Sequence, residues 1–335
     1  MKKLDCKEYE VFVGIDVSKD TLDICILKNN NDNDCDNQNK YYHIKNEKKF
    51  INKFVRDNID KLNSKEKVLF ICETTGGYEY TLLEAINNLG YDMHRANTRK
   101  VKNYIRSFGQ NAKTDKLDSL AIARYGEDRY KTLSLYKPLD KSIQSLKTMA
   151  KRHCDLKYML VQEKVRLKSP SYKNDELLCN SIKNIIEVLT KELKDLNEKI
   201  KFIIENSEEL QHKYNLLITF KGVGETTIFK LLALLPELGS LDRKEIASLS
   251  GLAPYAFDSG KKQGRRCIFG GRQEVRKSLY MAGMASMRHN KHMKSFYERL
   301  IKNGKKPMQA LVAIMRKIVI TLNAMIRDGL EYKYN

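Results

Sequence analysis

Residues 9–28, Tyr9-Glu-Val-Phe-Val-Gly-Ile-Asp16-Val-Ser-Lys-Asp-Thr-Leu-Asp-Ile-Cys-Ile-Leu-Lys28, decide the fold of the amino-terminal part of the chain. Apolar residues alternate with others at positions 11, 13 and 15, and again at positions 22, 24 and 26. This period of two, on both sides of a short Ser-Lys-Asp turn, predicts an antiparallel β-hairpin. Asp16 lies near the end of the first strand, where Asp is intrinsically disfavoured. Something other than strand propensity must therefore keep this carboxylate there.

The pattern after the hairpin continues with alternating strands and helices. A tract of Asn, Asp, Gln and Lys at 29–40 predicts a mobile loop. The segments that follow are a strand at 41–44, an amphipathic helix near 47–60, a buried strand at 68–72, a helix after Gly77, a short strand near 91–95 and helices to about 126. Three strands, one helix and then alternating strands and helices resemble the ribonuclease-H-like order. We therefore expect an α/β domain over residues 1–135.

The composition favours a polyanionic partner. The 335 residues include 62 Lys and Arg against 42 Asp and Glu, a formal net charge of +20. Nucleic acid is the first candidate and an anionic membrane surface the competing one. No run approaches the roughly 18 apolar residues of a spanning helix, and the first ten residues lack an apolar signal core, so we expect no membrane partner. The seven cysteines form no Cys-x-x-Cys pair, which fits reduced thiols in a cytoplasmic protein.

Residues 139–210 have the character of long charged helices, interrupted once at Ser169-Pro170-Ser171. The second helix carries an a/d seam over three heptads, which predicts a coiled-coil dimerisation segment at 136–212. Its apolar residues are Ile182, Ile186, Leu189, Leu193, Leu196, Ile200 and Ile203. We expect the seam to pair with another protomer, because the preceding helix has His153 and Glu163 in its own seam. Pairing with that helix, through residues such as Leu146 and Leu156, is the alternative.

Four carboxylates, Asp16, Glu73, Asp115 and Asp118, are expected to converge on one point. Glu73 ends a buried strand and precedes a Thr-Thr-Gly-Gly turn, and the other two share one face of a helix start. Hard oxygen ligands without a nearby His or Cys select Mg²⁺ or Mn²⁺, and two such ions about 4 Å apart can act on a phosphodiester. The structural alternative is a turn Asp and a helix start capped by Thr114. The joint pattern favours a metal site.

The region from about residue 213 is helical and contains two candidate nucleic-acid contacts. Residues 219–233 resemble a helix-hairpin-helix, in which Gly222 and Gly224 let backbone amides meet a phosphate; an ordinary glycine turn is the alternative. The second contact is a basic segment predicted to bind phosphates. Its residues are Lys261, Lys262, Arg265, Arg266, Arg272 and Arg276.

Ser259 lies in an Asp-Ser-Gly sequence directly before this basic segment. On sequence physics alone, an exposed turn serine explains it. A serine becomes a nucleophile only when a base, a metal or surrounding positive charge activates it. The sequence supplies the cations and no obvious local base.

These motifs, in this order, resemble the transposases of the insertion-sequence 110 family, the DEDD recombinases, over nearly the whole chain. The motifs are Gly-Ile-Asp16-Val-Ser-Lys, Glu73-Thr-Thr-Gly-Gly-Tyr, Lys-Thr-Asp115-Lys-Leu-Asp118, Gly222-Val-Gly-Glu-Thr-Thr, Gly251-Leu-Ala-Pro, Ser259-Gly-Lys-Lys, Gly270-Gly-Arg-Gln-Glu-Val-Arg276 and Phe296-Tyr-Glu-Arg-Leu. The resemblance implies a RuvC-like nuclease domain at 1–135, the coiled coil at 136–212 and a helical transposase domain at 213–335.

The resemblance also implies a mechanism and partners. Asp16, Glu73, Asp115 and Asp118 would hold magnesium, and Ser259 would attack a DNA phosphodiester to give a covalent phosphoserine. Family members similarly assemble as dimers that pair into tetramers, and a structured bridge RNA selects their donor and target DNA. A composite site across protomers is then expected, in the bacterial cytoplasm at the nucleoid.

Two rival functions are consistent with the same residues. One is a RuvC-like junction nuclease that uses metal-activated water, with Ser259 only binding phosphate. The other is a non-enzymatic, basic coiled-coil scaffold for nucleic acid. A trapped covalent DNA adduct separates the recombinase from both rivals.

Overall fold

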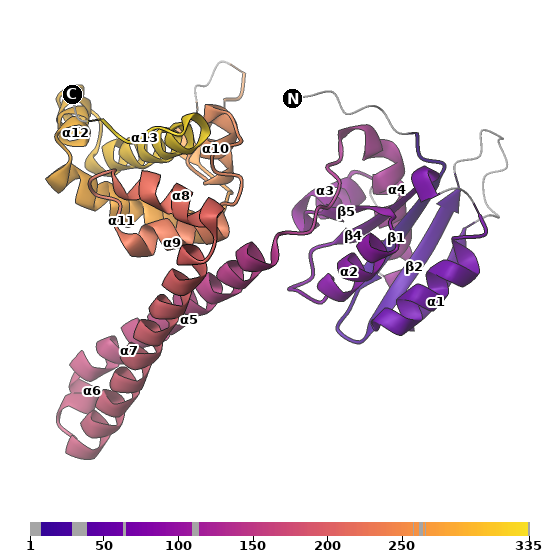
Figure 1. Ribbon diagram of the computed structural model, residues 1–335, viewed down its shortest axis with the longest axis horizontal. Coiled ribbons are helices and arrows are strands. Elements are labelled where there is room, and N and C mark those ends of the chain that lie inside the picture. Colours follow the sequence, from indigo (N-terminus) through magenta and orange to yellow (C-terminus); the bar gives the residue numbers. More distant parts are fainter. Residues whose placement is uncertain are drawn as a thin grey trace. The chain divides into compact units, whose positions relative to one another are not determined.

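The chain forms two compact units, residues 1–138 and 139–335, in the computed structural model (Figure 1). The structure describes residues 8–28, 39–62, 65–108, 114–256, 258–260, 264 and 266–333. The helices expected to form a coiled coil belong to the second unit. A separate dimerisation role for residues 136–212 stays a prediction.

A mixed five-stranded sheet forms the centre of the first unit. Its strands are β1 (Val11–Val17), β2 (Thr21–Lys28), β3 (Lys40–Lys45), β4 (Val68–Glu73) and β5 (Asp92–Ala96). They follow the order β3-β2-β1-β4-β5, and β2 is antiparallel to β1 and β3 whereas β4 is parallel to β1 and β5. This confirms the hairpin and the later strands, and the order is compatible with a ribonuclease-H-like domain. Residues 29–38 of the polar tract lie outside the described residues.

Helices cover both faces of this sheet. They are α1 (Lys48–Asn58), α2 (Tyr80–Asn88), α3 (Thr98–Ser107) and α4 (Asp115–Arg129), with 3-10 turns η1 (Lys65–Lys67) and η2 (Tyr130–Thr132). On one face, Val13 and Ile15 of β1 pack with apolar residues of α1 and α2. On the other, Phe12 packs with Ile122 and Tyr125 of α4. Even-numbered positions of β1 therefore face α4.

Helix α4 lies unusually close to β1. A Cβ added to Gly14 would stand 2.2 Å from the Ser119 carbonyl oxygen and 2.3 Å from the Ala123 backbone nitrogen. Further along the helix, a Cβ on Gly126 would meet Ile71 of β4 at 2.5 Å. The helix thus runs along the strands with its amino-terminal turn toward their carboxyl ends, called here the carboxyl edge of the sheet.

The second unit is almost entirely helical, as expected. Its elements are α5 (Lys141–Lys168), α6 (Pro170–Lys173), α7 (Glu176–Glu205), α8 (Glu208–Ile218), α9 (Glu225–Leu234), α10 (Arg243–Leu249), β6 (Pro254–Ala256), β7 (Arg266–Ile268), α11 (Gln273–His289), α12 (Lys291–Lys302) and α13 (Pro307–Asp328). One large core joins α8, α9, α11 and α13 to the nearer parts of α5 and α7.

The a/d seam of α7 packs against α5 of the same chain. Leu189 and Leu193 cluster with Leu156, and Leu160 lines the same contact. The structure therefore shows the alternative, in which α7 pairs with the preceding helix. We expected the seam of α7 to pair with another protomer. His153 is buried in this hairpin. Burial and nearby lysines lower its pKa to about 4, so the imidazole is neutral and the hairpin can accommodate it.

Helix α13 is long and apolar enough to cross a membrane, by length and composition alone. The sequence analysis did not identify this helix, because it looked for an uninterrupted run of apolar residues. Half of its most apolar window is buried within the unit. Ile314, Ile318 and Leu322 lie fully inside the core. Core burial therefore accounts for its apolar character.

Candidate active site

Asp16 and Glu73 lie side by side on neighbouring strands. The parallel register of β1 and β4 ends with Ile15 opposite Cys72, so Asp16 and Glu73 are the next residues on each strand. Alternation places Asp16 on the same face as Phe12, and Glu73 on the same face as Ile71, both of which pack toward α4. The two carboxylates therefore occupy the α4 face at the carboxyl edge.

Helix α4 brings the second pair of acids to this face. Thr114 caps the helix by accepting a hydrogen bond from the Leu117 amide at 3.3 Å, and Asp115 and Asp118 occupy the first turn. The capping interpretation is thus correct as local structure. The first turn of α4 can have a second role in binding a metal ion, because its acids lie close enough to Asp16 to act on it. Burial raises the pKa of Asp16, and the charges of Asp118 and Asp115 raise it further.

Asp23, which the sequence analysis did not single out, extends the acidic row. It pairs with Asp16 across β1 and β2, and its charge also raises the Asp16 pKa. His43 of β3 lies opposite Asp23, and its Nδ1 is 2.8 Å from the Asp23 Oδ1. The signal was present in the sequence, since the predicted hairpin register alone places residues 16 and 23 opposite each other.

The donor chemistry of this face fits Mg²⁺ or Mn²⁺. Carboxylate oxygens are the ligands these ions prefer, and a divalent cation would relieve the mutual repulsion recorded at Asp16. Across the described ranges, no three His, Cys, Asp or Glu side chains already stand as a finished set of metal ligands. The backbone thus brings the acids to one face, but their side chains, among the described residues, do not form a complete set of metal ligands.

A buried ion pair shapes the loop that follows Glu73. The Glu79 side chain is fully buried and accepts hydrogen bonds from the amides of Thr75 at 3.2 Å and Gly77 at 2.9 Å. Arg95 of β5 donates its Nε at 3.1 Å and its Nη2 at 2.5 Å to the same carboxylate. Burial alone would raise the Glu79 pKa, but these donors outweigh it and lower the pKa below its ordinary value. Glu79 therefore stays charged and orders the Thr-Thr-Gly-Gly turn.

Asn46 connects the loops that follow Asp16 and Glu73. Its Nδ2 donates to the Ser18 carbonyl at 3.1 Å and to the Tyr78 carbonyl at 3.0 Å. The two strand ends that carry these acids are therefore linked through one side chain. The sequence alone offered no signal for this link, since Asn46 follows β3 and lies far from both loops in the chain.

Ser259 is exposed in the loop between β6 and β7 of the second unit. Asp258 beside it accepts hydrogen bonds from Arg266 Nη1 at 2.6 Å and from the Gly264 amide at 2.9 Å, and these donors lower the Asp258 pKa. Gly260 follows at a φ of +54°, a conformation that favours glycine. The loop thus presents the serine between an anchored acid and a glycine.

The predicted basic contacts divide into three groups. Lys261, Lys262 and Arg265 lie outside the described residues. Arg272 forms two hydrogen bonds to Glu237, each 2.6 Å long. The remaining two arginines also have partners within the chain, because Arg266 binds Asp258 and Arg276 donates to the Gly270 carbonyl at 2.7 Å. These bonds give the three described arginines roles in the fold, and phosphate binding by any of the six stays a prediction.

The two glycines of the helix-hairpin-helix-like segment differ in environment. A Cβ on Gly222, whose φ is +103°, would come within 2.3 Å of the Ser286 Oγ of α11. Gly224, the N-cap of α9, has open space around its Cα and no side-chain cap. Packing therefore explains Gly222, whereas Gly224 leaves the start of α9 open to solvent or a ligand.

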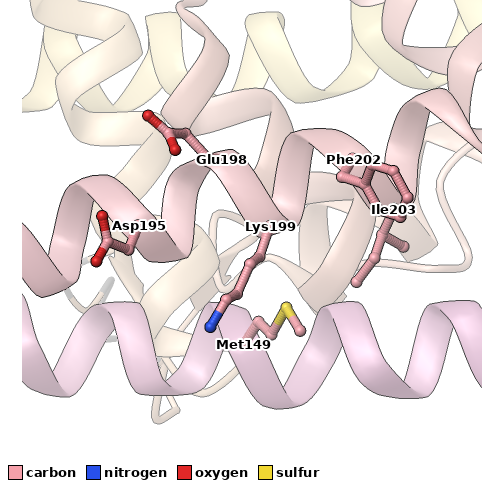
Figure 2. Close-up of a pocket in the computed structure, with 6 residues that line it drawn as sticks. All are labelled: Met149, Asp195, Glu198, Lys199, Phe202 and Ile203. Carbon is pink, nitrogen blue, oxygen red and sulfur yellow. The ribbon is translucent and has the colours of Figure 1, made fainter.

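A separate pocket lies between α5 and α7 of the second unit (Figure 2). None of the sequence-predicted site residues lines it. The residues that do are Met149, Asp195, Glu198, Lys199, Phe202 and Ile203. This pocket is therefore distinct from the carboxylate face and from the Ser259 loop.

Two family models match the chain. One, described as "Transposase" and built on the DEDD proteins of IS110 elements, matches residues 13–170. The other, described as "Transposase IS116/IS110/IS902 family", matches residues 214–298. The first match contains all four predicted carboxylates and the second contains Ser259.

Relatives include the pilin gene-inverting proteins of Moraxella lacunata and Moraxella bovis. Each is 28% identical over 324 residues, which is 96% of this chain and 97% of the relative. A shorter match is the insertion element IS110 uncharacterized 43.6 kDa protein of Streptomyces coelicolor, 30% identical over 119 residues, 35% of this chain and 29% of that protein. With matches to both of its units, the chain belongs to the IS110 family of transposases, enzymes that recombine DNA.

Proposed function

We propose that this protein cuts and rejoins DNA through a covalent phosphoserine at Ser259, with divalent cations held by the carboxylate cluster of Asp16, Glu73, Asp115 and Asp118. The observation that carries the proposal is the collection of these acids on one face of the sheet, by strand register and by the close approach of α4. A RuvC-like identity of the first unit is part of the same proposal.

The chemical step balances without an outside oxidant or reductant. The Ser259 Oγ forms a bond to phosphorus and loses its proton, while the bond from phosphorus to a deoxyribose oxygen breaks and that oxygen gains a proton. Attack by the hydroxyl of another strand reverses the step and releases the serine. A phosphoserine conserves the bond energy for rejoining, which suits recombination better than hydrolysis.

The carboxylate cluster would supply the electrostatic part of this reaction. Bound Mg²⁺ would stabilise the negative charge that develops on the phosphate. The side chains of the cluster orient the ion, and the Glu79–Arg95 pair orders the turn next to Glu73. Asp16 and its neighbours thus serve binding and orientation.

A structured bridge RNA that selects donor and target DNA completes the proposal. The formal charge of +20 exceeds what a single short duplex contact requires and is compatible with two nucleic-acid partners. This element rests on the family.

Homodimers that pair into tetramers are also part of the proposal. Their support is a set of exposed apolar side chains on the outer surface of the α5–α7 hairpin, away from the buried seam. The set includes Tyr158, Val161, Val165, Leu177, Ile185 and Val188.

The deciding experiment begins with RNA that copurifies with the protein, because its sequence exposes candidate DNA targets. The wild-type complex, with Mg²⁺ and those DNAs, should give a DNA adduct that survives denaturation and is lost on protease treatment. Ser259→Ala should abolish both adduct and strand exchange, whereas Ser240→Ala, another exposed serine, should leave them unchanged. Asp16→Ala should abolish the adduct without removing the nucleophile.

The rivals predict different results. If Ser259→Ala still cleaves DNA while Asp16→Ala does not, a water-using nuclease is correct. If the wild-type complex leaves every DNA unchanged, the scaffold is correct.

A further inference from the structure

Helix α3 begins directly beside Glu73. Ala96 at the end of β5 pairs with Glu73, and the Thr74 amide donates to the Ala96 carbonyl at 3.1 Å. Thr98, the first residue of α3, donates its hydroxyl to the Thr74 carbonyl at 2.8 Å. The start of the helix is therefore fixed at the carboxyl edge, next to the residues that follow Glu73.

Packing also fixes α3 against the helix that carries Asp115 and Asp118. Val101 is buried in the core shared with α4, and Ile105 packs at its margin. The Tyr104 hydroxyl donates to Asp128 of α4 at 2.5 Å. The outward face of α3 is thus held in a defined orientation, with its first turn at the carboxyl edge and Tyr104 next to the carboxy-terminal end of α4.

The outward face of α3 is basic. Positions 99, 102 and 106 share one side of the helix by their spacing of three and four. All three side chains, Arg99, Lys102 and Arg106, are exposed, and the helix contains no Asp or Glu. We call these three residues the α3 basic face.

Two of these three bases have no acidic partner among the described residues. In the part of the chain that the structure describes, Lys102 and Arg106 enter no ion pair. Lys102 and Arg106 thus lie exposed on α3, a helix whose first turn is fixed at the carboxyl edge.

We propose that the α3 basic face binds the phosphate backbone of the substrate DNA, on one side of the phosphodiester at the carboxylate cluster. From Arg99 to Arg106 the helix rises about 10 Å, on the order of three phosphate steps along one strand. Binding of this kind positions DNA without reading its sequence. The proposal rests on the proposed function, because it takes the carboxylate cluster as the place where DNA reacts.

The experiment removes three charges from each of two surfaces of the same unit in the full-length protein with its copurified RNA. The test variant is R99Q/K102Q/R106Q. The control variant, K49Q/K53Q/R56Q, removes three exposed bases from α1, on the opposite face of the sheet. The conservative variant R99K/R106K preserves the charge and reports on folding together with the melting temperature of each protein.

The probes are a short duplex DNA and a duplex RNA of matching arbitrary sequence, each titrated over a range of salt. We expect the test variant to bind DNA on the order of 100-fold more weakly at about 0.1 M salt, with a salt slope smaller by about 2 to 3. The control and conservative variants should stay close to wild type. Equal losses in test and control variants overturn the proposal, as does a loss confined to RNA.

Failure of this inference and failure of the proposed function give different results. If α3 does not bind DNA, the wild-type complex still forms the Ser259 adduct. If the proposed function is wrong, the adduct is absent from wild type, whatever the three-charge variants do to DNA affinity.

Discussion

Asp16 and Glu79 are acids near the same sheet edge, and their surroundings shift their pKa values in opposite directions. Burial and three neighbouring acids raise the pKa of Asp16. Burial acts in the same direction at Glu79, but Arg95 and three backbone amides outweigh it and lower the pKa. The fold therefore favours the ionised form of Glu79, whereas the surroundings of Asp16 disfavour its ionised form in the absence of a cation.

Asp16→Asn should separate metal binding from folding. Without Mg²⁺ the variant should be at least as stable as wild type, because the substitution removes a repelled charge. Mg²⁺ at about 100 times its dissociation constant should stabilise wild type by about 2.7 kcal/mol and the variant far less. Thermal unfolding with and without Mg²⁺ measures both. Asp57→Asn, an exposed acid of α1, should keep the full response, and a Mg²⁺ response preserved in Asp16→Asn would contradict the metal site.

Glu79→Ala should destabilise the first unit by about 3–5 kcal/mol, because it leaves Arg95 without its buried partner. The matched control is Glu84→Ala, which breaks an exposed pair with Lys48 at 3.5 Å and should cost no more than about 1 kcal/mol. Urea unfolding measures both values. Similar costs for the two variants would show that the Glu79 pair adds nothing beyond a surface contact.

The stability that ionised Glu79 contributes should depend on pH, and its lowered pKa gives the direction of this dependence. A carboxyl group whose pKa is lowered by folding stabilises the fold above its ordinary pKa of 4.5, and this contribution is lost as pH falls through the lowered value. The gap between wild type and Glu79→Gln should therefore be constant near neutral pH and shrink in acid. Unfolding curves between neutral pH and about pH 3 measure it; a gap that widens in acid would mean the pKa is raised.

At the scale of elements, contact between α4 and the sheet depends on glycine. Gly14→Ala places a methyl group against backbone atoms of Ser119 and Ala123, which cannot move independently of the helix. Overpacking of this kind costs about 1–3 kcal/mol or more. Gly126→Ala is the matched control, because its Cβ meets only side chains, Ile71 at 2.5 Å and Phe12 at 3.6 Å. Unfolding free energies should fall more for Gly14→Ala, and equal losses would contradict a backbone clash.

The position of Asp115 and Asp118 relative to Asp16 follows from the same contact. The close approach at Gly14 sets where the first turn of the helix lies along β1, and Asp115 and Asp118 occupy that turn. If Gly14→Ala shifts the helix without unfolding it, the Mg²⁺ response should weaken as well. The element that carries two of the acids is thus positioned by a residue with no side chain.

At the scale of the whole molecule, the two units have separate cores. The clusters of the first unit draw on residues up to Tyr136, and those of the second begin at Ile143. A fragment of residues 1–138 should therefore fold alone, unfold cooperatively and retain the Mg²⁺ response. Circular dichroism of this fragment and of residues 139–335 provides the test, and a fragment that is unfolded by itself would contradict the division.

Sequence patterns determined much of this protein, because local periodicity and motif order carry that information. Alternation at 11–15 and 22–26 predicted the hairpin. The ends of its first strand and of the later strand at 68–72 predicted that Asp16 and Glu73 lie at one edge of the sheet. The family followed from the order of motifs along the chain. The a/d seam of α7 was correctly located by the same periodicity, but the period does not specify which helix fills it.

Only the tertiary structure decided which residues meet across long stretches of chain. It paired the α7 seam with α5, gave Arg272 to Glu237, buried Glu79 against Arg95 and linked two loops through Asn46. No periodic or local signature identifies the partner in any of these contacts, because each depends on how separate elements pack. The physical reason is that sequence patterns report the face a residue presents, whereas packing determines what that face meets.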